Sequence, residues 1–180
     1  MEKKIIIAGS GGQGILFLGK MLMSAAMIEG RDVTWFPSYG AEMRGGTANC
    51  TVIIADKMIG SPVVTTPDIL IVMNRASLVR FLPDLKKSGM LFYDSSLIPG
   101  DISRKDIFVV PVPSTKMAGD MDNQKSANMV MLGAFIAKTA LLKPKTIFSI
   151  FDDNADPKKA AAFSANRGLV RKGMDYIENT

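Results

Sequence analysis

The segment Gly9 to Gly14, which reads Gly-Ser-Gly-Gly-Gln-Gly, constrains the fold more than any other part of this sequence. It follows the apolar run Lys4 to Ala8, whose β-branched isoleucines favour a buried strand of a parallel sheet. It precedes Ile15 to Ile28, where apolar residues recur at helical spacing, and Gly30 lies where such a helix would end. Strand, glycine turn and helix in this order predict the first βα unit of an α/β protein.

Alternating strands and helices are predicted along the rest of the chain. Strand-like apolar runs cover residues 33–36, 48–54, 69–73, 90–94 and 107–112, and helical patterns cover residues 77–85 and 128–142. Pro144 can open a further helix, and Asp156-Pro157 can start the last one. Residues 113–125 lack periodicity and are interpreted as an exposed connection. We therefore predict a single domain over residues 1–180, a three-layer α/β fold with a mostly parallel sheet and a Rossmann-like first βα unit.

The absence of histidine and the single cysteine, Cys50, exclude several kinds of chemistry. Histidine-based acid–base catalysis, the usual zinc sites and an iron-sulfur cluster held by this chain alone all need residues that the sequence lacks. Cys50 has no histidine to activate it and enters an apolar strand, so we expect a buried structural thiol. We predict no catalytic residue and no metal site in this chain.

Charge and hydropathy narrow the range of partners. The net charge of +5 comes from 22 basic and 17 acidic residues, which are scattered without long runs of one sign. This pattern gives little support for nucleic-acid binding and is compatible with weak attraction for an anionic small molecule or an acidic protein surface. Apolar runs are too short for a signal peptide or a membrane span. We expect a cytoplasmic protein without membrane contact.

The first glycine segment matches the pattern G-x-G-x-x-G, which is open to two interpretations. Such a turn can hold a phosphate at the start of the helix, or the glycines can serve only the sharp turn and close packing. A dinucleotide site would also need an acidic residue near the end of the second strand. Asp32 precedes that strand, and Trp35, Phe36 and Pro37 occupy the expected position. A contact between this turn and one phosphate or diphosphate stays open as an interpretation. The alternative function is a stand-alone nucleotide-binding module that uses Gly9 to Gly14.

A second glycine-rich segment, Pro37 to Cys50, combines turn formers with polar and charged side chains. Arg44 could present its planar guanidinium to a carboxylate or a phosphate, or it could form an internal ion pair with Glu42. Both interpretations stay open. Asn128 follows the polar residues Asn123, Lys125 and Ser126 and could contact a ligand, although capping of the following helix is the simpler role.

Three motifs in this order resemble the gamma subunit of 2-oxoacid:ferredoxin oxidoreductases. They are the GGQG turn at Gly11 to Gly14, the connector PSYGAEMRGGTANC at Pro37 to Cys50, and NMVMLGA at Asn128 to Ala134. The resemblance runs over nearly the whole chain. It implies a complex that oxidatively decarboxylates a 2-oxoacid with coenzyme A, giving an acyl-CoA, carbon dioxide and reduced ferredoxin. The motifs do not encode which 2-oxoacid is used, so 2-oxoglutarate, ketoisovalerate, pyruvate and indolepyruvate all stay open.

The resemblance also implies how the work is divided. Thiamine diphosphate and iron-sulfur clusters would be held by alpha and beta subunits and, where the complex has one, a delta subunit, and ferredoxin would bind to the complex. This chain would bind no cofactor alone, would support assembly and would contact coenzyme A. The residues that match the family motifs, and that we expect to face partner subunits or coenzyme A, are Gly11, Gly12, Gln13, Gly14, Tyr39, Glu42, Met43, Arg44, Gly45, Gly46, Thr47, Asn49 and Asn128.

Overall fold

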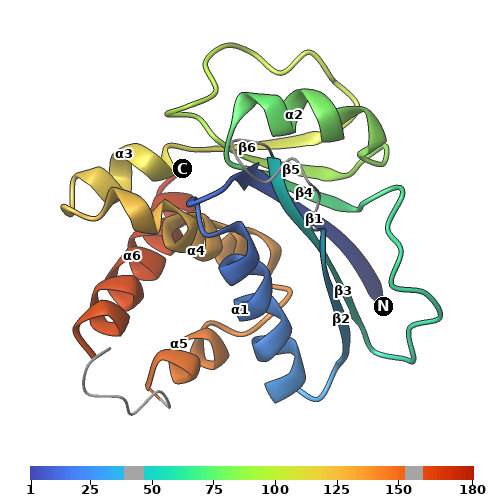
Figure 1. Ribbon diagram of the computed structural model, residues 1–180, viewed down its shortest axis with the longest axis horizontal. Coiled ribbons are helices and arrows are strands. Elements are labelled where there is room, and N and C mark those ends of the chain that lie inside the picture. The colour runs from blue at the N-terminus through green and yellow to red at the C-terminus, as the bar shows by residue number, and fades with distance from the viewer. Residues whose placement is uncertain (39–46, 153–159) are drawn as a thin grey trace.

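A computed structural model describes residues 1–38, 47–152 and 160–180, and in these ranges the chain forms a six-stranded sheet with helices on both faces (Figure 1). The strands are β1 (Glu2–Ser10), β2 (Asp32–Ser38), β3 (Thr47–Ala55), β4 (Ile69–Val72), β5 (Met90–Asp94) and β6 (Phe108–Val112). Their order across the sheet is β2-β3-β1-β4-β5-β6. Strands β1, β4, β5 and β6 run parallel, whereas β3 runs antiparallel to both β1 and β2. The prediction of a mostly parallel α/β sheet is confirmed.

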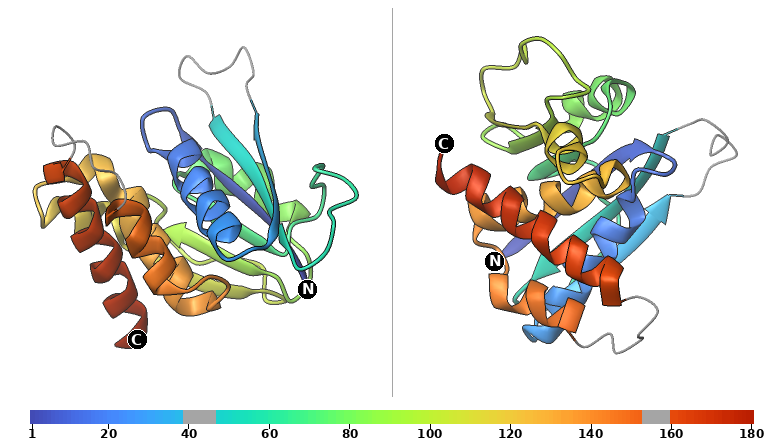
Figure 2. Two further views of the ribbon diagram at one scale, coloured as in Figure 1. Left: turned by 90° about the horizontal axis from the view of Figure 1, so that it is seen from below. Right: turned by 90° about the vertical axis from the view of Figure 1, so that its left-hand side faces the viewer.

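The helices are distributed unequally over the two faces of the sheet (Figures 1 and 2). Helices α1 (Ile15–Ile28), α4 (Ala127–Thr139) and α5 (Pro144–Asp152) contribute to the larger core on one face, and α6 (Ala160–Glu178) packs mainly on α4. The other face carries the short α2 (Arg75–Phe81), which continues into the 3-10 turn η2 (Leu82–Asp84). The isoleucine run of β1 serves both cores, since Ile5 and Ile7 enter the larger one and Ile6 enters the smaller one.

Two local expectations need correction. Residues 113–125 are not a plain connection, because they contain α3 (Ser114–Gly119) and the start of the 3-10 turn η3 (Gln124–Ser126). Strand β2 does not stop at Phe36 but continues through Pro37 to Ser38. Proline is tolerated there because β2 is an edge strand, so the missing N–H interrupts no ladder on its outer side.

The helical segments otherwise lie close to their expected places. Pro144 begins α5, whereas α4 ends at Thr139, earlier than expected, because Ala140 adopts a left-handed conformation with φ +48°. Asp156 and Pro157, expected to start the last helix, lie outside the described residues. None of the helices in the described part of the chain combines the length and the hydropathy that a membrane span requires.

Candidate functional site

The turn from Gly9 to Gly14 leaves the carboxyl end of β1 and is held in shape by Gln13. The Gln13 Oε1 atom accepts a hydrogen bond of 2.7 Å from the Ser10 backbone N–H. Its Nε2 atom donates one of 2.9 Å to the carbonyl oxygen of Met73, just after the neighbouring strand β4. Both ends of the Gln13 carboxamide are therefore engaged within the protein, and its observed role is to fix the turn to β4.

Gly14 must be glycine for two separate reasons. Its φ of +69° lies in the left-handed region, and a Cβ atom there would lie 2.3 Å from Asn128 Nδ2. The same Nδ2 atom donates a hydrogen bond of 3.0 Å to the Gly14 carbonyl oxygen. Asn128 lies inside α4. The N-cap residue of that helix is Ser126, whose side chain makes no capping hydrogen bond. The expectation that Asn128 caps α4 is thus wrong, because its amide fastens α4 to the glycine turn instead.

Asn74 is a further residue of this site that the sequence did not reveal. Its Nδ2 atom donates a hydrogen bond of 2.6 Å to Ser10 Oγ, and its Oδ1 atom accepts one of 2.7 Å from the Ser77 backbone N–H. Asn74 therefore caps α2 and anchors the start of the glycine turn at once. The available signal was an asparagine between an apolar strand and a helical pattern, which is typical of an N-cap.

The glycine turn presents backbone donors that the rest of the described chain does not use. Within the described ranges, the N–H groups of Gly11 and Gly12 donate to no acceptor, and no side chain caps the start of α1. Gly12 has a φ of +87°, and a Cβ atom built on it would meet nothing within 4 Å. Free N–H groups beside a helix N-terminus carry partial positive charge. This arrangement can bind an anion such as a phosphate.

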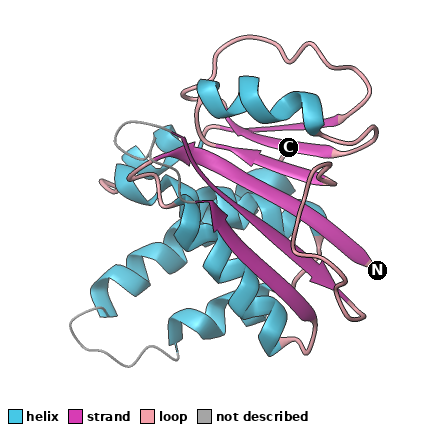
Figure 3. Ribbon diagram, turned by 45° about the vertical axis from the view of Figure 1, so that its right-hand side comes forward, coloured by secondary structure: helices cyan, strands magenta, loops and turns pink. Residues whose placement is uncertain are grey.

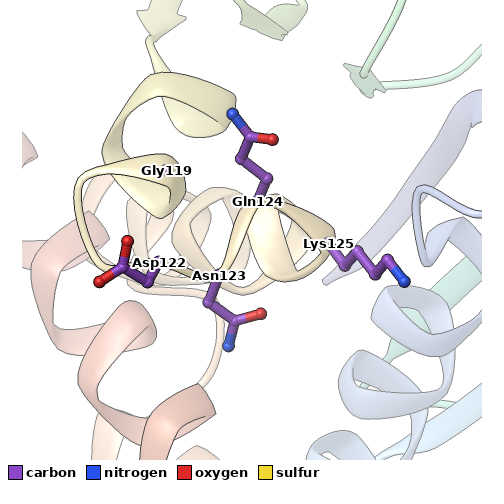
Figure 4. A pocket seen from close by; sticks show the side chains of 5 residues that line it. All are labelled: Gly119, Asp122, Asn123, Gln124 and Lys125. Atoms are coloured by element: carbon purple, nitrogen blue, oxygen red, sulfur yellow. The ribbon is translucent and has the colours of Figure 1, made fainter.

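A polar pocket of about 490 Å³ lies before α4 and is lined by Gly119, Asp122, Asn123, Gln124 and Lys125. In Figure 4, the Lys125 side chain extends away from those of Asp122 and Asn123. Lys125 precedes Asn128 by about one helical turn, and Asn128 is bonded to Gly14. The Lys125 ammonium group therefore belongs to the segment that leads into α4, the helix whose Asn128 is bonded to the glycine turn.

The two described ends of the second glycine segment lie at the same end of the sheet as the first glycine turn. Ser10, at the end of β1, pairs with Thr47, which begins β3, and Ser38, at the end of β2, pairs with Asn49. Because β3 runs antiparallel to β1 and β2, the strand residues that flank the two glycine segments lie next to one another. The residues Tyr39, Glu42, Met43, Arg44, Gly45 and Gly46, which the sequence singled out, lie outside the described ranges.

Cys50 is buried as expected and belongs to the packing between α1 and the strands. A Cβ atom on Gly19 would lie 2.6 Å from Cys50 Sγ, so the absence of a side chain at Gly19 lets α1 approach β3 closely. Burial raises the pKa of the Cys50 thiol to about 12. The reactive thiolate form of Cys50 is therefore scarce at neutral pH, in keeping with a buried thiol that serves packing. Across the described ranges, no three histidine, cysteine, aspartate or glutamate side chains gather into a metal site.

Comparison with known proteins identifies the family. The family described as pyruvate ferredoxin/flavodoxin oxidoreductase matches residues 4–176. The chain belongs to this family. It is 33% identical over 185 residues to the 2-oxoglutarate synthase subunit KorC of Methanothermobacter marburgensis, with 97% of this chain and 100% of KorC covered. It is 41% identical over 137 residues to the ketoisovalerate oxidoreductase subunit VorA of the same organism.

The extent of the matches differs between members of the oxidoreductase family. The VorA match covers 76% of this chain but only 28% of VorA, so the chain spans just over a quarter of the length of that relative. Among solved structures, a 2-oxoglutarate:ferredoxin oxidoreductase from Magnetococcus marinus, bound to 2-oxoglutarate, coenzyme A and succinyl-CoA, has the same fold with a TM-score of 0.88. That likeness, at 24% identity, covers 99% of this chain and 31% of the other. A keto/oxoacid ferredoxin oxidoreductase gamma subunit from Geobacter sulfurreducens has a TM-score of 0.83, also at 24% identity, with 99% of each chain covered.

Proposed function

We propose that this chain is the gamma subunit of a 2-oxoacid:ferredoxin oxidoreductase and that residues 1–180 act in it as one domain. The observation that carries the proposal is the match to KorC, which spans 97% of this chain and all of KorC, a protein named as a subunit. The complex would oxidatively decarboxylate a 2-oxoacid with coenzyme A, giving an acyl-CoA, carbon dioxide and reduced ferredoxin. Relatives named for 2-oxoglutarate, ketoisovalerate and pyruvate define the substrates to test.

In this proposal the redox chemistry belongs to other subunits. The sequence has no histidine, and its single cysteine is buried with a raised pKa, so the chain offers no thiolate set for an iron-sulfur cluster. Thiamine diphosphate and the clusters would be held by alpha and beta subunits, and by a delta subunit where one is present. The contribution of this chain would be assembly and substrate support.

The glycine turn is the part of this chain that we propose contacts coenzyme A. Coenzyme A supplies the thiol that accepts the acyl group, and it carries phosphate groups remote from that thiol. The free N–H groups of Gly11 and Gly12 and the uncapped start of α1 fit a phosphate. Asn74, Gln13 and Asn128 hold this turn from β4 and α4, so their role is to fix its shape. Lys125 adds a positive charge in the pocket before α4.

The subunit assignment is tested by purifying a tagged chain from its own host under native conditions. We expect the tagged chain to bring with it an activity that reduces ferredoxin when a 2-oxoacid and coenzyme A are both present. A panel of 2-oxoglutarate, ketoisovalerate, pyruvate and indolepyruvate then identifies the substrate. The isolated chain should show no turnover, and turnover by that chain alone would contradict the proposal.

The coenzyme A contact is tested by placing a carboxylate beside the free N–H groups. In Gly12→Asp the new side chain points into open space, where it would repel a bound phosphate. We expect the KM for coenzyme A of the assembled complex to rise about tenfold or more, equivalent to about 1.4 kcal/mol. Gly30→Asp is the matched control, because Gly30 has a φ of +70° and equally open surroundings at the other end of α1. An equal KM for the two variants would remove the turn from the coenzyme site.

The free donors of the turn also favour a second function, that of a stand-alone nucleotide-binding module. This alternative differs in expecting tight binding without partner subunits. Calorimetric titration of the isolated chain with NAD, FAD, ATP and coenzyme A separates the two. Submillimolar binding of NAD or FAD that Gly12→Asp abolishes and Gly30→Asp preserves would favour the module.

A further inference from the structure

A groove of about 280 Å³ lies on the face of the sheet that carries α2. Its floor is formed by β1, β2 and β3, and its far wall by α2 and the segment that precedes β4. The residues that line it are Ile6, Phe36, Ser38, Asn49, Thr51, Pro62, Val63, Val64, Arg80 and Phe81. The groove is thus mainly apolar where Phe36, Val63 and Phe81 line it, and Arg80 adds a charged group on the α2 side. It is polar along β3, where Asn49 and Thr51 point to the same side of the strand.

The two faces of the β2–β3 hairpin differ in how they are covered. On one face, α1 packs on both strands, and Cys50 and Val52 of β3 enter the larger core. On the other face, Arg80 and Phe81 at the end of α2 line the groove together with these strands, and Figure 3 shows the strands open toward the viewer. Phe36 is left 58% exposed and Val63 67% exposed. Large apolar side chains gathered around an open groove are typical of protein–protein contact surfaces.

Longer members of the family show what kind of molecule could cover this surface. The region matched in VorA is 28% of that protein, and the fold of this chain makes up 31% of the Magnetococcus marinus chain. In those proteins the domain is therefore joined to a much larger polypeptide. KorC, by contrast, is matched over 100% of its length and is named as a subunit, so any counterpart of the rest of VorA would lie on other polypeptides of the KorC complex.

We infer that the groove docks another subunit of the same complex, one that inserts an apolar side chain between Phe36 and Val63. This inference rests on the proposed function and names the surface through which the chain would be held in the complex. The Asn49 amide can both donate to and accept from the backbone of the inserted segment, and the Thr51 hydroxyl can do the same. The groove volume suits one or two side chains, as expected for the central anchor of an interface. Asn49 also belongs to the family connector, which ties this surface to the region singled out in the sequence.

The test is a competition for incorporation into the complex. Each variant is produced together with wild-type chain that carries a different tag, and the ratio of the two is measured in the purified complex by quantitative mass spectrometry. Val63→Asp and Phe36→Ser should be incorporated about tenfold less than wild type. Two matched controls lie outside the groove: Val79→Asp on α2, at 68% exposure, and Phe108→Ser on the opposite edge strand, at 63% exposure. Both controls should be incorporated within about twofold of wild type.

The remaining outcomes separate the groove from the function. If the wild-type chain enters no complex with 2-oxoacid activity, the proposed function fails and the groove proposal fails with it. If the wild-type chain is incorporated and the groove variants compete equally well, the groove proposal alone fails. It also fails if the isolated chain is a dimer that Val63→Asp dissociates, since the groove would then bind a second copy. Thermal unfolding shows whether each groove variant folds. A variant that does not fold is replaced by Asn49→Ala or Thr51→Val, which retain the apolar side chains of the groove. These two variants should also be incorporated less than wild type.

Discussion

Gly133 of α4 and Gly173 of α6 occupy reciprocal positions where the two helices cross. A Cβ atom on Gly133 would lie 1.9 Å from the carbonyl oxygen of Val170, and one on Gly173 would lie 2.0 Å from the carbonyl oxygen of Val130. Each glycine therefore admits the backbone of the opposite helix, which cannot move aside as a flexible side chain would. This contact explains why a glycine stands within the buried part of α4, which runs from Ala127 to Ile136.

Gly133→Ala and Gly173→Ala should each destabilise the protein. The added methyl group forces the two helices apart, and overpacking of this kind costs about 1–3 kcal/mol, with these close backbone contacts near the upper end. Gly168→Ala in α6 is the control, because its Cβ would meet only Met121 Cε at 3.4 Å. Relief of the poor helix propensity of glycine should stabilise that variant by up to about 1 kcal/mol. Urea unfolding measures all three, and equal effects would contradict the crossing geometry.

Replacement of Asn128 should loosen the glycine turn. Asn128→Ala removes the hydrogen bond to the Gly14 carbonyl oxygen and leaves that oxygen without its partner, so we expect a loss of about 1–2 kcal/mol in unfolding free energy. Asn128→Asp keeps the shape but places a carboxylate oxygen against the carbonyl, and it should cost more than the alanine variant. A stability equal to wild type for Asn128→Asp would show that this hydrogen bond is not important.

The Cys50 thiol should make folding sensitive to alkaline pH. Its pKa is raised from 9.0 to about 12 by burial, so between these values the unfolded chain loses a proton that the folded chain keeps. The contribution of this thiol is thus fully present below pH 9.0 and is lost as the pH rises toward about 12, at about 1.4 kcal/mol per pH unit. Cys50→Ala should show a shallower decline of unfolding free energy over this range. Parallel curves for the two proteins would show that the thiol does not titrate differently on folding.

The buried carboxylate of Asp94 should be more important for stability than its partner Thr115. It accepts hydrogen bonds from the Ser96 N–H at 3.0 Å, the Thr115 N–H at 3.1 Å and Thr115 Oγ1 at 2.5 Å, and it thereby joins the end of β5 to the start of α3. Asp94→Ala leaves two N–H groups without acceptors and should cost about 3 kcal/mol, whereas Thr115→Val removes one donor and should cost about 1 kcal/mol. Chemical denaturation of both variants measures the difference, and the reverse order would contradict this account.

Much of the fold could be predicted because local patterns specify it. The isoleucine run of β1, the glycine turn and the apolar spacing of α1 all predict their elements without help from distant residues. The antiparallel direction of β3 was missed, although Asn49 and Thr51 alternate with buried Ala48, Cys50 and Val52. Such alternation is typical of a strand with one open face, which antiparallel sheets allow and fully covered parallel strands do not.

The site was less accessible to sequence reasoning because its bonds join distant segments. Gln13 reaches Met73 across 60 positions, and Asn128 reaches Gly14 across 114. Neither pairing leaves a local pattern, so Gln13 and Asn128 were identified as important without their observed roles, and Asn74 was missed. Helix α3 was missed for a similar reason, since it is short and is fastened from another strand by Asp94.

The antiparallel direction of β3 also determines where changes in chain length would least disturb the sheet. Ser38 and Asn49 are paired across β2 and β3, so the intervening stretch begins and ends on neighbouring strands whatever its length. Doubling the length of a loop adds only about 0.6 kcal/mol of closure entropy. Insertions and deletions between Ser38 and Asn49 should therefore leave the pairing of β2 with β3 intact.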